Sequence, residues 1–168
     1  MFISHLVCAL SLVVFFILQT AIFSQSPLVS GTADMILLFL VAWSLQEEVK
    51  NSWMWTVIAG VLVSVFSAMP FFAPLIAYLA VVGLSKALQR RVWQNPLLAM
   101  LIVVLLGTFF QHALYVIVLQ ITGAPIPWAQ SLDNVILPSV LLNMIFALPI
   151  YAIVKDLSRR ISPMEVDV

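Results

Sequence analysis

Charge is what this sequence lacks most. Only 8% of its 168 residues are Asp, Glu, Lys or Arg, whereas 64% are hydrophobic, and the mean hydropathy is +1.17. A soluble domain of this length has too few charges to cover so much apolar surface, so lipid is the expected solvent. The formal net charge is zero, so the chain has no basic field that would attract nucleic acid.

Cysteine is nearly absent as well. Cys8 is the single cysteine and lies within an apolar run, which excludes an internal disulfide and disfavours a metal site. The chain also lacks a repeat of solenoid period and a low-complexity linker. These absences predict one integral-membrane domain, residues 1–168, without a cofactor.

Long apolar runs, by contrast, recur along the chain. A bilayer-crossing helix needs about 20 largely apolar residues, and the candidates are residues 2–23, 33–46, 53–69, 71–88, 97–121 and 135–154. The second reaches spanning length only if its helix includes part of a flanking loop. The first has neither a basic n-region nor a clear cleavage site, so we expect a retained helix rather than a signal peptide. The expected fold class is an all-α membrane protein, a bundle of six transmembrane helices.

The positive charges support this count. With six crossings the connecting segments alternate sides, and every Lys and Arg falls on one side: Lys50, Lys86, Arg90, Arg91, Lys155, Arg159 and Arg160. The positive-inside rule then places both termini in the cytoplasm. Four tryptophans fit aromatic belts, three near the inner boundary and one near the outer: Trp53, Trp55, Trp93 and Trp128.

Ionised residues are missing from the centres of the six runs. Asp34 and Asp133 fall near the outer boundary, where we expect water to reach them. A proton- or sodium-driven carrier normally needs a buried carboxylate, so that class is disfavoured. The aqueous loops are too short for a catalytic domain, and His5 and His112 lie on different helices without a nearby carboxylate. We therefore expect a protein that is not an enzyme.

Uncharged polar residues remain in the last two runs. Gln111, His112 and Tyr115 lie near the middle of the fifth run, and Asn143 lies at a similar depth in the sixth. A hydrogen bond from Asn143 to Gln111 or His112 is expected, because such runs are neighbours in a bundle. Two interpretations stay open: these groups fasten the helices together, or they line a small-molecule cavity.

Small residues recur every three or four positions in the third and fourth runs: Gly60, Ser64, Ala68, Ala77, Ala80, Gly83 and Ala87. Such faces let helix backbones approach closely. We expect them to pack the two helices as a hairpin; a surplus small face could instead receive the transmembrane helix of a partner.

Two prolines interrupt the sixth run. Pro138 lies near the expected helix start, where its missing N–H is harmless and its fixed φ suits a helical entry. Pro149 removes the bond to the carbonyl of Ile145 and is expected to kink the helix. The segment is therefore predicted to be a bent helix packed inside the bundle.

The same segment, ILPSVLLNMIFALPIYAIVKDLSRR, resembles the closing segment of the bacterial rod shape-determining protein MreD family, with these matches: Pro138, Ser139, Asn143, Pro149, Tyr151, Arg159 and Arg160. GTADMILLFLVAWSL resembles the second helix of that family, with Asp34 kept and Ala33 in place of its proline. LIAYLAVVGLSKALQRRVW resembles the fourth helix and basic loop, with Gly83 in register. The third helix departs, because it lacks the aspartate that the family often carries before its turn.

This resemblance implies a six-helix bundle similar to the substrate-binding subunits of energy-coupling-factor transporters. It also implies a non-catalytic subunit of the cell-elongation complex in the bacterial cytoplasmic membrane, needed for rod shape and peripheral peptidoglycan synthesis. The direct partner would be an MreC-like single-pass membrane protein, with the RodA glycosyltransferase, a class B penicillin-binding protein and the MreB filament as indirect partners. The loop TGAPIPWAQSLDN, with Trp128 beside Asp133, is either an interfacial partner-binding segment or an ordinary anchored loop.

A vitamin-type binding subunit of a membrane transporter is the alternative function. Such subunits usually carry Ala-x-x-x-Ala on the first helix, whereas here Ala9 is followed at that spacing by Val13. Few polar residues lie toward the outer side to line their kind of pocket: Gln19, Asp34, Gln130, Asp133 and Asn134.

Overall fold

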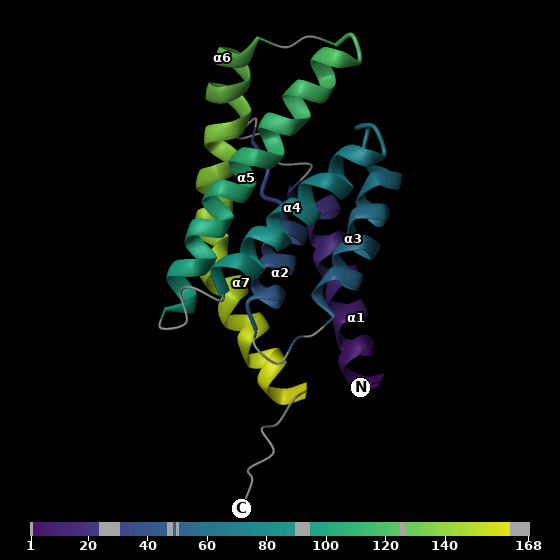
Figure 1. The fold of residues 1–168 in the computed structure, drawn as a ribbon, viewed down its shortest axis with the longest axis vertical. Coiled ribbons are helices and arrows are strands. Elements are labelled where there is room, and N and C mark those ends of the chain that lie inside the picture. The colour runs from purple at the N-terminus through teal and green to yellow at the C-terminus, as the bar shows by residue number, and fades with distance from the viewer. Residues whose placement is uncertain are drawn as a thin grey trace, which may run out of the picture.

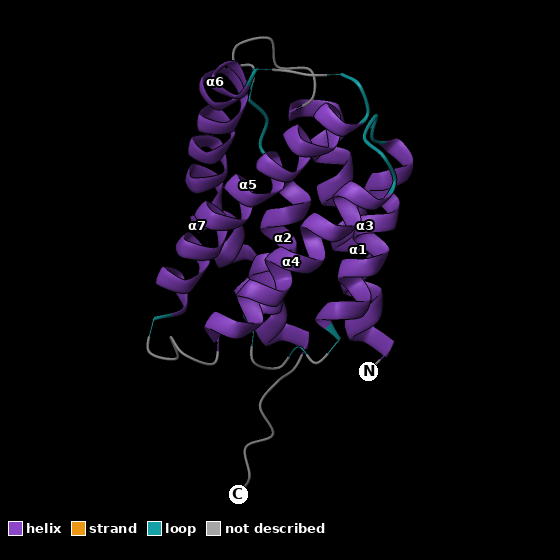
Figure 2. Ribbon diagram, turned by 45° about the horizontal axis from the view of Figure 1, so that its top comes forward, coloured by secondary structure: helices purple, strands orange, loops and turns teal. Residues whose placement is uncertain are grey.

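The computed structural model describes residues 2–23, 31–46, 49, 51–89, 95–124 and 127–161, and side chains from His5 onward. This part of the chain is helical and contains no strand (Figures 1 and 2). The elements are α1 (Phe2–Leu18), η1 (Gln19–Phe23), α2 (Met35–Ser44), α3 (Ser52–Phe66), α4 (Phe72–Gln89), α5 (Pro96–Ile121), α6 (Trp128–Ser131), η2 (Leu132–Ile136) and α7 (Leu137–Ile161). The two η elements are short π-helices, and α6, η2 and α7 follow one another without a break.

The helices run up and down in one bundle. Figure 1 shows the start of α1 and the end of α7 at the same end of the bundle, opposite the turn between α3 and α4. Three described helices are long and apolar enough to cross a membrane: Phe72–Gln89, Pro96–Ile121 and Trp128–Ile161. Three shorter apolar helices accompany them: His5–Ala21, Met35–Ser44 and Ser52–Phe66. The all-helical class is therefore confirmed, and the three long apolar helices are compatible with a multi-pass membrane protein; that six helices cross a membrane stays a prediction.

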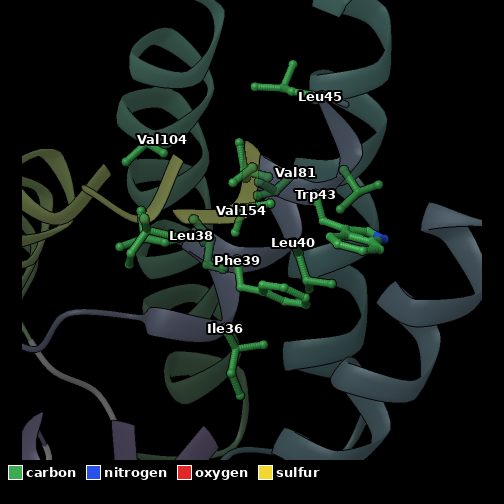
Figure 3. Close-up of a cluster of buried hydrophobic side chains, with 14 of the residues drawn as sticks. Ile36, Leu38, Phe39, Leu40, Trp43, Leu45, Val81, Val104 and Val154 are labelled. Carbon is green, nitrogen blue, oxygen red and sulfur yellow. The ribbon is translucent and has the colours of Figure 1, made fainter. Parts of the chain in front are cut away.

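Helix α2 is the core of this bundle. All ten of its residues are buried, as expected of a helix that is apolar around its whole circumference and enclosed by other helices. It packs against α7, α4, α1, α3 and α5. Figure 3 shows its side chains on more than one side of the helix, with Leu38 pointing away from Phe39 and Trp43. At about 1.5 Å per residue a helix of this length covers about half of a bilayer core.

The C-terminal end of α2 is held by polar groups of α4. Gln89 donates to the carbonyl of Leu45 over 3.2 Å, and the Lys86 ammonium donates to the carbonyl of Val49 over 3.3 Å. Ser44 and Ser85 hydroxyls lie 2.6 Å apart. The bond from Gln89 occupies the carbonyl of the C-cap residue, one of the groups that a helix end leaves without an intrahelical partner.

The hairpin of α3 and α4 forms as the small residues predicted, but not through all of them. A Cβ on Gly60 would lie 2.7 Å from Cδ1 of Leu75 and 3.0 Å from its Cα, so only glycine permits this approach. Ala77 is buried in the bundle, whereas Ala80 and Ala87 are exposed. The small residues of α4 therefore lie on two faces of this helix, one buried and one exposed.

The last helix starts earlier than predicted. It begins at Trp128, not near residue 135, and it continues to Ile161. The stretch at Trp128 and Asp133 is thus neither a separate interfacial segment nor a loop. Pro138 lies in the first turn of α7, but η2 and α7 form one continuous helix, so this proline does not begin a helix as expected. The π-helix η2 directly before it is a wide turn, and such a turn accommodates a residue without an N–H.

Two other expectations concern single residues. The belt assignment of Trp55 is wrong, because its side chain is buried and its ring lies 6.0 Å from that of His5. Trp53 is exposed, as a belt residue should be. Pro149 lies inside α7 on an exposed face, and a kink there stays a prediction. Four residues used in the topology argument lie outside the described part of the chain: Lys50, Arg90, Arg91 and Trp93.

Candidate functional site

The chain enters α2 through a short non-helical segment, residues 31–34, directly before the N-terminus of this helix. Backbone groups at membrane depth must find partners inside the protein. Ser139 Oγ accepts a hydrogen bond from the N–H of Thr32 over 3.1 Å, and Asn143 Oδ1 accepts one from the N–H of Asp34 over 2.8 Å. Ser139 and Asn143 are four residues apart on one face of α7, so this face acts as a template for the segment.

Close packing fixes the same segment. Gly31 is buried, and a Cβ there would lie 2.6 Å from the backbone nitrogen of Ser139 and 2.7 Å from Cβ of Pro138. The segment therefore touches the backbone of α7 directly. Gly31 is required by this approach, since no side chain fits between the two chains.

Asp34 is the N-cap of α2. Its Oδ1 accepts from the N–H of Leu37 over 2.8 Å, and Gln19 Oε1 accepts from the N–H of Ile36 over 3.1 Å. Two of the donors that the first turn of a helix leaves free are thereby satisfied. The side chains that do this come from the helix's own cap and from η1.

The carboxylate of Asp34 also joins three helices. Tyr78 of α4 donates its hydroxyl to Oδ2 over 2.9 Å, and Gln111 of α5 donates its amide to the same oxygen over 2.7 Å. Asp34 is only 8% exposed. The expectation that it lies at a water-exposed boundary is wrong, and the argument against ion-coupled carriers that relied on the absence of a buried carboxylate loses its basis.

A cavity of about 220 Å³ adjoins this carboxylate. It lies between α1, η1, α3, α4 and α5, toward the end of the bundle where α1, α3 and α5 finish. Its polar lining comes from Gln19, Thr20, Thr32, Asp34, Gln111, His112 and Tyr115, and Phe16 and Phe66 add aromatic rings. The rings of Phe16 and Phe66 pack with centroids 5.1 Å apart, and those of His112 and Tyr115 with centroids 6.2 Å apart.

The structure brings five of the residues predicted from sequence to this region: Asp34, Gln111, His112, Pro138 and Asn143. Gln111 and His112 line the cavity, whereas Asn143 is fully buried beside it. The predicted bond from Asn143 to Gln111 or His112 is not formed. Asn143 instead donates its amide to Thr108 over 2.9 Å, and the two polar sets are linked through Asp34.

The other predicted site residues lie elsewhere. A Cβ on Gly83 would lie 3.4 Å from a ring atom of Trp53, which is an ordinary van der Waals distance. Trp128 is exposed at the start of α6. Tyr151 is buried near the inner end, where it interacts with Gln46 and where the Lys155 ammonium lies 5.9 Å from its ring centroid. Pro149 is on the exposed face of α7. None of these four touches the cavity.

Four side chains in the hydrogen bonds described above were not predicted as site residues: Gln19, Tyr78, Thr108 and Ser139. Tyr78 was treated as part of an apolar run, although a tyrosine buried in a membrane needs a partner for its hydroxyl. Gln19 was considered only as a pocket residue of the alternative function. Several apolar runs each contain an isolated polar side chain. This pattern was the sequence signal that these side chains bond one another inside the bundle.

A second hollow, of about 260 Å³, lies between α4 and α5. Its lining is apolar, from Ala80, Val81, Leu84, Leu106, Gly107 and Phe110. Among the residues that the structure describes, no group of three or more His, Cys, Asp or Glu is placed to hold a metal ion. The cavity at Asp34 is therefore the site with polar chemistry.

Comparison of the chain with known proteins finds no family model, no curated protein and no solved structure that matches it.

Proposed function

We propose that the chain is a non-catalytic subunit of the bacterial cell-elongation complex, of the MreD type, that acts by binding an MreC-like single-pass membrane protein. The observation that carries the proposal is the convergence of the motif residues. Two separate motifs of the resemblance meet at the entry to α2, where Asn143 accepts from the N–H of Asp34 and Ser139 accepts from the N–H of Thr32. The motifs thus describe one structural unit, which supports a relationship beyond the shared abundance of leucine.

The placement of polar groups supports a role in assembly. Three polar side chains of these motifs, those of Asp34, Ser139 and Asn143, are buried and hold the entry to α2, and the exposed faces of α1, α3, α5 and α7 carry large apolar residues. Such faces contact lipid or other membrane helices. The RodA glycosyltransferase, a class B penicillin-binding protein and the MreB filament would be reached through the MreC-like partner.

The experiment is affinity purification of the tagged full-length chain in mild detergent from a rod-shaped bacterium that encodes it. The expected result is co-purification of an MreC-like protein, together with loss of rod shape on deletion and its recovery by the wild-type gene. A tagged membrane protein of similar size and span number is the control for non-specific recovery. Normal rods after deletion, with no MreC-like protein recovered, would overturn the proposal.

The membrane topology is part of the proposal: both termini lie in the cytoplasm. Its support is the placement of Lys155, Arg159 and Arg160 in the last turns of α7, at the end of the bundle where α1 starts. In a Cys8→Ser background, Thr122→Cys should react with an impermeant maleimide in intact cells. Arg159→Cys should react only after permeabilisation. Labelling of both in intact cells would contradict this topology.

A small-molecule-binding transporter subunit is the second candidate, and the cavity beside Asp34 is the observation that favours it. The same architecture is implied, similar to substrate-binding subunits of energy-coupling-factor transporters. The same purification separates the two functions, because this candidate requires recovery of a coupling ATPase complex instead of an MreC-like protein.

A further inference from the structure

We propose that the cavity beside Asp34 binds a small organic cation, a ligand that carries a protonated amine. This goes beyond the proposed function, because a ligand inside the bundle is compatible with either assembly. The argument combines the charge of the lining, an unused acceptor and the aromatic walls.

The first step concerns charge. Asp34 is the one acidic residue among the residues that line the cavity, and none of the lining residues is Lys or Arg. Its partners there are uncharged donors, Tyr78 and Gln111. The N-terminus of α2 offsets roughly half a unit charge, so the described surroundings leave net negative charge. A cation is favoured in this cavity, and an anion meets a carboxylate without a counter-charge.

The second step concerns an acceptor without a partner. Gln111 is 3% exposed and lines the cavity; its Nε2 donates to Asp34, but its Oε1 has no hydrogen-bond partner. A buried amide oxygen left in this state costs free energy, so it indicates a donor that is absent from the protein itself. An ammonium group has three donors and no acceptor. The carboxylate already accepts from Leu37, Tyr78 and Gln111, so it offers an ammonium its negative charge, while the oxygen of Gln111 is the acceptor without a donor.

The third step concerns the remainder of the ligand. Phe16, Phe66 and Tyr115 give the lining aromatic rings, which attract cations over their faces and pack against apolar ligand atoms. The volume of about 220 Å³ exceeds the needs of a single bare ion and is below the roughly 300–1,000 Å³ of sites for drug-sized ligands. A small amine with a short apolar or aromatic body fits these limits.

The test uses the purified full-length chain in lipid nanodiscs and three ligands that share a phenylethyl body and differ in the polar group: 2-phenylethylamine, 2-phenylethanol and 3-phenylpropanoate. Thermal unfolding and calorimetric titration are measured at constant ionic strength. Sodium chloride alone is the control for binding of an inorganic cation. We expect the amine to raise the unfolding temperature and the other two ligands to leave it unchanged. A ligand at 100 times its dissociation constant favours the folded state about 100-fold, so binding gives a measurable shift.

Two variants locate the site. Asp34→Asn keeps a good N-cap but removes the charge, and we expect the amine to bind at least tenfold more weakly. Thr20→Trp fills the cavity without touching the cap and should abolish binding. Leu10→Trp, the same kind of change on an exposed face of α1, should leave binding unchanged. If Asp34→Asn does not fold, Thr20→Trp with its Leu10→Trp control decides the matter alone.

The outcomes that overturn the proposal are equally specific. They are no shift with the amine, an equal shift with the alcohol, binding retained in Thr20→Trp, or a shift with sodium chloride alone. Because the measurement uses the isolated chain, failure here leaves recovery of an MreC-like partner untouched, and failure to recover that partner leaves amine binding untouched.

Discussion

Replacement of Asn143 by leucine tests how the segment before α2 is held. Asn143 is fully buried and makes two interhelical bonds, one with the N–H of Asp34 and one with Thr108. Loss of each bond costs about 0.6 kcal/mol in a membrane protein, and the unpaired N–H of Asp34 adds roughly 1–3 kcal/mol. The free energy of unfolding should therefore fall by about 2–4 kcal/mol.

The assay is equilibrium unfolding of the full-length protein in mixed micelles of increasing SDS content, followed by far-ultraviolet circular dichroism. Thr108→Val removes only the second bond but leaves the buried amide of Asn143 without its acceptor, so it should cost about 1.6–3.6 kcal/mol. Ile145→Leu, on an exposed face of α7, should stay within about 0.5 kcal/mol of wild type. A fall for Asn143→Leu no larger than that of Ile145→Leu would refute the reasoning. Because Asn143 does not line the cavity, the folded variant should still bind the amine.

Three further changes follow from the same contacts and use the same unfolding assay. Gly31→Ala places a Cβ against the backbone of α7 and should destabilise the protein by about 1–3 kcal/mol. Gly83→Ala, whose Cβ would meet only a ring atom at 3.4 Å, should cost less than about 0.5 kcal/mol, and equal effects of the two changes would contradict the packing described. Tyr78→Phe removes the hydroxyl that donates to Asp34 and should cost about 1–2 kcal/mol with secondary structure unchanged; no loss would show that this bond contributes nothing.

The positions of the helices could be predicted because hydropathy and turn residues act locally. The expected runs 53–69, 71–88 and 97–121 differ from α3, α4 and α5 by only a few residues at each end. The start of the last helix could not be predicted, because Asp133 and Asn134 are polar residues of a kind that favours a loop. They are exposed on a helix instead, and an exposed helical position near the membrane surface accepts polar side chains as well as a loop does.

The burial of Asp34 could not be predicted from hydropathy. A carboxylate at the edge of an apolar run usually marks the membrane boundary, and here the boundary was assigned on that rule. Its actual depth depends on residues far along the chain: Tyr78, Gln111 and Asn143 each supply a bond from a different helix. Long-range contacts of this kind decide the depth of a residue, and a window of twenty residues does not contain them.

The length of the second apolar run links the fold to the candidate site. This run was the shortest of the six, and in the structure its helix has only ten residues. At about 1.5 Å per residue α2 fills the centre of the bundle over about 15 Å, roughly half of the hydrocarbon core. Directly before its N-terminus lie a non-helical segment, a buried carboxylate and a cavity. The shortest apolar run of the sequence therefore adjoins the polar site of the bundle. Extending α2 by an engineered helical turn should remove the cavity together with the contacts of Asp34.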